Sequence, residues 1–239
     1  MSVPAPPGAG RLQPRRCPAS LRPLLDAVAD ADAVTFARHD IPVPEGARES
    51  AVLMLFADHP VNGPDVLLVE RAATLRSHAG QVAFPGGTVD PGDADVVATA
   101  LREAEEETGL EPGGVTPLAL LPRLFLPPTG FAVTPVLAAW DRPSAVHAVD
   151  AGETAAVVRV PLDHLADPAN RIKVSAPSGF VGPAFLVEGL LVWGFTGALL
   201  SAVLDLGGWA RPWESGARVH DVSRAWAAAR AGRQEVAGQ

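Results

Sequence analysis

The most chemically suggestive stretch of the sequence is REAEEE, residues 102–107. Successive residues of an α-helix are about 100° apart, so Glu103, Glu106 and Glu107 share one face, here called the glutamate face, and Glu105 points away. Like charges at these spacings cost about 0.2–0.5 kcal/mol per pair, and a divalent cation, which prefers hard oxygen ligands, would offset that repulsion. The spacing fits a metal site. A solvated acidic face, with Arg102 paired to Glu106, is the alternative.

The loop that leads into this stretch has the composition of a ligand-binding loop. It reads GGTVDPGD, residues 86–93. Glycine lets the backbone approach a ligand closely, and Asp90 and Asp93 bring further oxygen atoms near the helix start. An apolar stripe predicts a helix over residues 93–108, with Asp93 as its N-cap and Gly109 as its stop.

Residues 86–110 resemble the signature of the Nudix hydrolases. The second half of that signature is Arg-Glu-apolar-any-Glu-Glu-any-Gly-apolar, and REAEEETGL, residues 102–110, fills it completely. The resemblance implies that the three glutamates of the glutamate face hold Mg²⁺ or Mn²⁺ and act in catalysis. It also implies that Arg102 orients these glutamates.

The first half of the signature departs from the family pattern, which places a glutamate between its glycine and its arginine. Counted forward from Gly87, that position falls on Asp93; counted back from Arg102, it falls on Ala94. The loop is thus one residue longer than the general pattern. The role of a carboxylate at this position is left open.

The segment before the loop resembles one branch of that family, the coenzyme A diphosphatases. That branch has Leu-Leu-Thr-x-Arg, then Arg, Gly and Phe-Pro-Gly-Gly at fixed spacings. This chain has LLVERA at 67–72, then Arg76, Gly80 and FPGG at 84–87, with Val69 in place of the usual threonine. The match covers every spacing of the pattern.

These residues are candidates for contact with substrate phosphates. Guanidinium groups bind phosphate oxygens in a forked geometry, and coenzyme A carries a diphosphate and a 3′-phosphate. The resemblance therefore implies substrate contacts from Arg71, Arg76 and His78, and from the backbone at Gly86 and Gly87. Solvent-exposed arginines and a histidine that bonds only within its loop are the alternatives.

The resemblance implies a metal-dependent hydrolase of the diphosphate bond of coenzyme A or a derivative, with 4′-phosphopantetheine and adenosine 3′,5′-bisphosphate as products. The general base would be a helix glutamate or a carboxylate from another loop, for which Glu153 is the candidate. An exposed loop glutamate is the other interpretation of Glu153. Another nucleoside diphosphate derivative (ADP-ribose, a dinucleotide or an oxidised dNTP) is the alternative substrate, and a non-catalytic Nudix binding module is the alternative function.

The apolar pattern predicts the elements that hold these residues. Runs at 51–56 and 65–69, separated by an Asn-Gly-Pro turn, indicate a hairpin. Further strands are expected at 82–84, 115–121, 132–140 and 155–160, and further helices at 196–206 and 222–230. Strands interleaved with helices favour an α/β (α+β) layered domain. The resemblance specifies a single domain of the Nudix type, an α/β/α sandwich with a mixed β-sheet.

Composition divides the chain into three expected parts. Residues 1–20 are rich in proline and glycine and are expected to form a disordered leader. Residues 21–206 would form the Nudix domain, with its box at 86–110. Residues 207–239 would be a C-terminal extension that contains the last predicted helix.

Charge and hydropathy limit the partners. A formal charge of −8 argues against nucleic acid held by a general basic field. The apolar stretch 184–206 is interrupted by Glu188 and Asp205, so a buried strand and a core helix are expected there rather than a membrane span. One cysteine, Cys17, and the lack of an apolar signal core favour a cytoplasmic protein. The expected partner is a small-molecule substrate, and a homodimer is left open.

Overall fold

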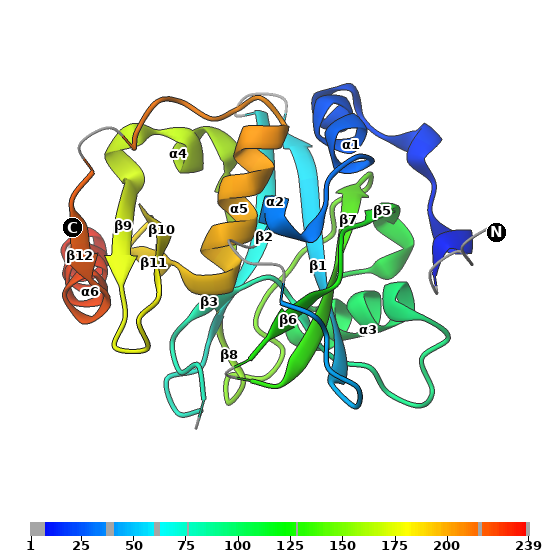
Figure 1. Cartoon of the computed structure of the whole chain (residues 1–239), viewed down its shortest axis with the longest axis horizontal. Helices are drawn as coiled ribbons and strands as arrows, with labels where there is room; N and C mark the ends of the chain where they lie inside the picture. The colour runs from blue at the N-terminus through cyan, green and yellow to red at the C-terminus, as the bar shows by residue number, and fades with distance from the viewer. Residues whose placement is uncertain are drawn as a thin grey trace.

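The structure is a computed structural model that describes residues 8–36, 41–59, 63–75, 77–127, 129–214 and 217–237. These residues form two β-sheets with helices packed on them (Figure 1). The main sheet has the strand path β3-β2-β1-β7-β5, with β4 paired to β1, β6 to β7 and β8 to β2. Its strands are β1 (Arg48–His59), β2 (Gly63–Arg71), β3 (Val82–Ala83), β4 (Gly86–Thr88), β5 (Val115–Leu120), β6 (Leu124–Leu126), β7 (Phe131–Trp140) and β8 (Thr154–Pro161).

The main sheet is mixed, because β1 runs parallel to β7 and antiparallel to β2. The β1–β2 hairpin is the one predicted by the apolar runs at 51–56 and 65–69. The strands predicted before and after the acidic helix are β3, β5, β7 and β8, close to their expected bounds. The mixed sheet of the sequence prediction is therefore confirmed.

Helices cover both faces of the central hairpin. Along β1, Leu53 and Leu55 pack in one apolar cluster with α3 (Val96–Thr108), whereas Met54 and Phe56 pack in another with α5 (Gly194–Leu206). This alternation follows from the period of two in a strand, which sends successive side chains to opposite faces. Figure 1 shows α3 and α5 on the two sides of β1 and β2. Shorter helices are α1 (Arg22–Val28), α2 (Ala33–Phe36) and α4 (Leu162–Ala166). The α/β/α sandwich is confirmed.

The second sheet was only partly foreseen. Its strand order is β11-β10-β9-β12, from β9 (Arg171–Ser175), β10 (Val181–Val187), β11 (Leu190–Val192) and β12 (Val219–Asp221). Helix α6 (Val222–Ala237) packs on it, so residues expected to be an extension complete this sheet and cover it. The apolar stretch 184–206 forms part of β10, then β11 and α5, as the buried interpretation predicts. Among the described residues, no helix combines the length and hydropathy that crossing a bilayer requires.

The segment before α1 differs from the disordered leader that we expected. Within residues 8–21 the chain forms short 3-10 helices at Ala9–Arg11, Pro14–Arg16 and Ala19–Leu21. The N–H of Gln13 donates to the carbonyl of Pro117 in β5 at 2.8 Å. Cys17 and Leu21 are buried in the core cluster that contains α5. Burial of these side chains compensates for the ordering of a proline-rich segment. Residues 1–7 lie outside the described residues.

Candidate active site

The glutamate face lies on α3, whose two ends are fixed by local capping. Asp95 is the N-cap and accepts a hydrogen bond from the helix backbone at 2.9 Å. Gly109 ends the helix with a φ of 67°, a left-handed conformation that favours glycine. The helix therefore begins at Val96, and the expectation that Asp93 caps it is wrong. Asp93 instead directs its carboxylate to Arg102.

Arg102 connects the loop to the glutamate face. Its guanidinium donates to the two carboxylate oxygens of Asp93, each at 3.0 Å, and to the carbonyl of Thr88 at 3.1 Å. Its Nη1 also donates at 3.0 Å to Glu103 and at 3.0 Å to Glu106. The hydrogen bonds from Arg102 hold the pKa of the Asp93 carboxyl well below its ordinary value. Arg102 thus orients two glutamates, and Asp93 holds Arg102 in place.

Gly86 and Gly87 lie on β4, which pairs with β1 and passes beside α3. A Cβ at Gly87 would collide with the carboxylate of Glu103, and a Cβ at Gly86 would collide with the carbonyl of Ala51. The backbone N–H of Gly86 donates to Glu107 Oε2 at 3.1 Å. The two glycines therefore bring the backbone into direct contact with the glutamate face, at a separation that no larger residue allows.

Glu107 is the most enclosed member of the glutamate face. Its side chain is 11% exposed, against 19% for Glu103 and 58% for Glu106. Burial raises the pKa of Glu107 to about 7, although the Gly86 N–H and the charge of Arg71 oppose the shift. Burial also raises the pKa of Glu103. In both carboxylates burial outweighs the neighbouring arginine, and such perturbed carboxylates are typical of functional sites.

Arg71 stands at the end of β2, beside the glutamate face. Its Nη1 lies 3.9 Å from Glu107 Oε1, and its Nε is buried with no hydrogen-bond partner in the described structure. Its backbone N–H donates to the carbonyl of Gln81 at 2.9 Å, and its carbonyl accepts from the N–H of Gly80 at 3.1 Å. The end of β2 thus places a cation, with an N–H donor that bonds to none of the described residues, next to the most enclosed member of the glutamate face.

The other residues predicted for the site are Glu153, His78 and Arg76. Glu153 is exposed, but it is close enough for its charge to contribute to the raised pKa of Glu107. His78 is exposed, and its Nδ1 lies 2.9 Å from Gln81 Oε1. Arg76 lies outside the described residues. The sequence did not predict that Asp93 bonds to Arg102. The count forward from Gly87 in the box pattern was the signal that marked this position.

The donor set of the glutamate face fits a divalent cation in kind, because all three side chains offer carboxylate oxygens. As the side chains stand, no three His, Cys, Asp or Glu residues of the described ranges are arranged to hold a metal ion. In this arrangement Arg102 Nη1 bonds to Glu103 and Glu106, and the Gly86 N–H bonds to Glu107. A cation on this face would compete with Arg102 for the same oxygens.

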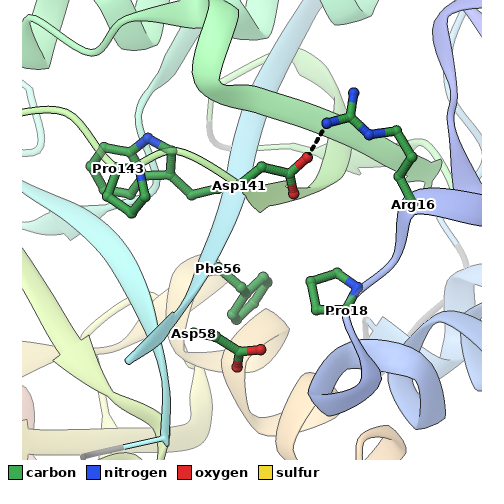
Figure 2. A pocket seen from close by; sticks show the side chains of 7 residues that line it. Arg16, Pro18, Phe56, Asp58, Asp141 and Pro143 are labelled. Atoms are coloured by element: carbon green, nitrogen blue, oxygen red, sulfur yellow. Dashed lines mark hydrogen bonds and ion pairs between the residues drawn. The ribbon is translucent and has the colours of Figure 1, made fainter. Parts of the chain in front are cut away.

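A separate cleft of about 460 Å³ lies at the other end of β1. Phe56 and Asp58 line it from β1, and Figure 2 shows the ion pair between Arg16 and Asp141 at its rim. The glycines of β4 pair with the beginning of the same strand, at Ala51 and Val52. The cleft is therefore distinct from the glutamate face.

Comparison with known proteins finds one matching family and several proteins of similar sequence. Residues 47–177 match the family described as the NUDIX domain. A protein of Cronobacter sakazakii described as an uncharacterized Nudix hydrolase, NudL, is 48% identical over 115 residues, which cover 48% of this chain and 58% of that protein. The NudL protein of Shigella flexneri serotype 5b is 44% identical over 119 residues, covering 50% of this chain and 60% of that protein. The chain thus spans less than two thirds of the length of these relatives.

Solved structures are similar at lower sequence identity. The Nudix hydrolase RenU of M. smegmatis has a TM-score of 0.47 and 20% identity, covering 70% of this chain and 89% of that one. A NUDIX hydrolase of Alicyclobacillus acidocaldarius has a TM-score of 0.47 and 22% identity, covering 67% and 92%. The family match extends over more than half of the chain and includes the whole loop and glutamate face. This chain belongs to the NUDIX domain family.

Proposed function

We propose that this chain hydrolyses the diphosphate bond of coenzyme A or one of its derivatives, giving 4′-phosphopantetheine and adenosine 3′,5′-bisphosphate. Family membership supports hydrolysis of a nucleoside diphosphate derivative. The observation that carries the choice of substrate is Arg71, at the matching position of the segment before the box. It lies beside Glu107, and its buried Nε has no hydrogen-bond partner among the described residues. A guanidinium in this place can bind a phosphate oxygen next to carboxylates that attract a cation.

In this proposal Glu103, Glu106 and Glu107 hold Mg²⁺ or Mn²⁺. When bound, such a cation supplies positive charge to the diphosphate and lowers the pKa of a coordinated water. The raised pKa values of Glu103 and Glu107 support the assignment, because a nearby cation favours the charged carboxylates that burial disfavours. The helical spacing puts Glu103 and Glu106 on one side of α3, and Arg102 Nη1 holds a carboxylate oxygen of each until a cation replaces it.

The remaining residues of the proposal bind and position the substrate. Arg71, together with Arg76 and His78 further along the sequence, contacts the phosphates, and the glycines of β4 let the substrate approach the backbone. Glu153, or a glutamate of the face, accepts the proton from the attacking water. Glu153 is supported by its position, since its charge acts on Glu107.

The test is a hydrolysis screen of the full chain with Mg²⁺ and with Mn²⁺, in which products are identified by mass. The substrates are coenzyme A, an acyl-coenzyme A, ADP-ribose and NADH. The proposal expects the highest kcat/KM for a pantetheine-containing substrate, with cleavage between the two phosphates. A preference for ADP-ribose or NADH would overturn the coenzyme A assignment and leave diphosphate hydrolysis standing.

A further inference from the structure

The C-terminal helix α6 contacts the segment that carries Arg71. A Cβ at Gly80 would lie 2.7 Å from Trp226 Cζ2, so the indole ring lies directly on the Gly80 backbone, whose φ is 66°. The N–H of Gly80 in turn donates to the carbonyl of Arg71 at 3.1 Å. A single chain of contacts therefore leads from α6 to the arginine beside the glutamate face.

A second contact reaches the same point independently. Arg233 Nη1 donates to Glu70 Oε2 at 2.8 Å, and Arg233 Nη2 donates to the carbonyl of Gly189 at 3.2 Å. Glu70 is buried, directly precedes Arg71, and stands where the register between β2 and β8 shifts. Without Arg233 the buried Glu70 carboxylate would lose this ion pair, so Arg233 holds the end of β2 in place.

The helix that makes these contacts is itself anchored. Val222, Ala225 and Ala229 are buried against the second sheet, in a cluster with Val174 and Leu191. Positions 226 and 233 are seven residues apart, so the two side chains lie on the same face of α6. This face of the helix packs on the second sheet, with Trp226 beside the same cluster. From it Trp226 reaches Gly80 and Arg233 reaches Glu70 near the end of β2.

We propose that α6 positions the substrate-binding segment, with Trp226 and Arg233 acting as positioning residues that hold Arg71 toward Glu107. The inference rests on the proposed function for the role of Arg71. It assigns to the C-terminal residues a part in substrate binding that their distance along the sequence from the box does not suggest.

The first test is hydrogen exchange of the full chain, measured on peptides that cover residues 71–84. In Trp226→Ala and Arg233→Ala, these amides should exchange at least several-fold faster than in the wild type. Arg224→Ala is the matched control, because Arg224 is an exposed arginine of the same helix. Trp226→Phe should restore much of the protection. Unchanged exchange in both alanine variants would overturn the proposal, whatever substrate the chain hydrolyses.

The second test is kinetic and uses the diphosphate that the wild type hydrolyses best. Trp226→Ala should displace Arg71 and so weaken its charge-assisted contact with a substrate phosphate. The KM of the variant should rise about tenfold, with little change in kcat. If Trp226 acts through Arg71, adding Trp226→Ala to Arg71→Ala should raise KM no further, because coupled residues are non-additive. Additive effects, or a fall in kcat alone, would contradict the positioning role. If the wild type hydrolyses no diphosphate, the proposed function fails, and hydrogen exchange alone decides whether α6 holds the segment.

Discussion

At the scale of single residues, the site depends on one very close approach. Gly87 leaves only the space that the Glu103 carboxylate needs. Gly87→Ala should therefore push Glu103 away from its position on the face. Misplacement of a reacting group by about 1 Å can cost on the order of 10²-fold in rate, so a large fall in kcat/KM is expected. Steady-state kinetics with coenzyme A checks it.

Gly92→Ala is the control for that variant. Gly92 belongs to the same loop, but a Cβ there would meet no atom of the described part of the chain within 4 Å. Its activity should remain close to that of the wild type. Equal losses in the two variants would show that the loop, rather than the contact with Glu103, is sensitive.

Glu107 gives a prediction on stability. Burial raises its pKa from 4.5 to about 7, so the folded protein holds this proton more tightly than the unfolded chain does. Without added metal, the wild type should lose stability as the pH rises from about 4.5 to 7, on the order of 3 kcal/mol at most. Glu107→Gln stays neutral and should have the higher Tm at pH 8 in EDTA, with little difference at pH 4.5. A lower Tm of the variant at pH 8 would contradict this assignment.

At the scale of elements, the box is a loop and a helix joined by one arginine. The helix itself was predictable, because its apolar stripe and Gly109 are local signals. Its first residue was not, because Asp93 and Asp95 are both good caps and only the path of the loop decides between them. Asp95 caps the helix, and Asp93 bonds to Arg102. Asp93, one of the two positions to which the count along the family pattern leads, thus bonds to the arginine of the box.

Asp93→Asn tests that link between loop and helix. The change weakens two charge-assisted hydrogen bonds to Arg102 and should lower the free energy of unfolding by about 1.5–3 kcal/mol at neutral pH. It should also lower kcat, since Arg102 orients Glu103 and Glu106. Asp90→Asn is the control, because the Asp90 side chain is 65% exposed and lies 3.7 Å from Arg102. Urea unfolding of both variants measures the difference.

At the scale of the whole molecule, prediction succeeded where the signal was local. The β1–β2 hairpin, β7 and α5 follow from apolar runs and turn residues. The short strands β9 and β12 do not, because they are paired across a long separation in sequence, and Val219 opposite Lys173 has no local signature. The packing of residues 8–20 was not predicted either, because their proline and glycine content outweighed the signal of the few side chains that are buried, such as Cys17.

Leu21→Ala tests whether this first segment belongs to the core. Leu21 is 1% exposed and packs in the cluster that contains α5. Its truncation should cost about 2–5 kcal/mol of unfolding free energy, as for other buried leucines. Arg15→Ala, an exposed neighbour, should change stability by less than about 0.5 kcal/mol. Similar small effects of both substitutions would mean that the segment is dispensable.

The central claim is that the glutamate face carries out metal-dependent diphosphate hydrolysis of coenzyme A. The most direct measurement is the Mg²⁺-dependent kcat/KM for coenzyme A of the wild type and of Glu107→Gln, which keeps an acceptor for the Gly86 N–H but loses the charge. The account predicts a loss of about 10²-fold or more in the variant, with the folded state intact. Full, metal-dependent turnover by Glu107→Gln would contradict it.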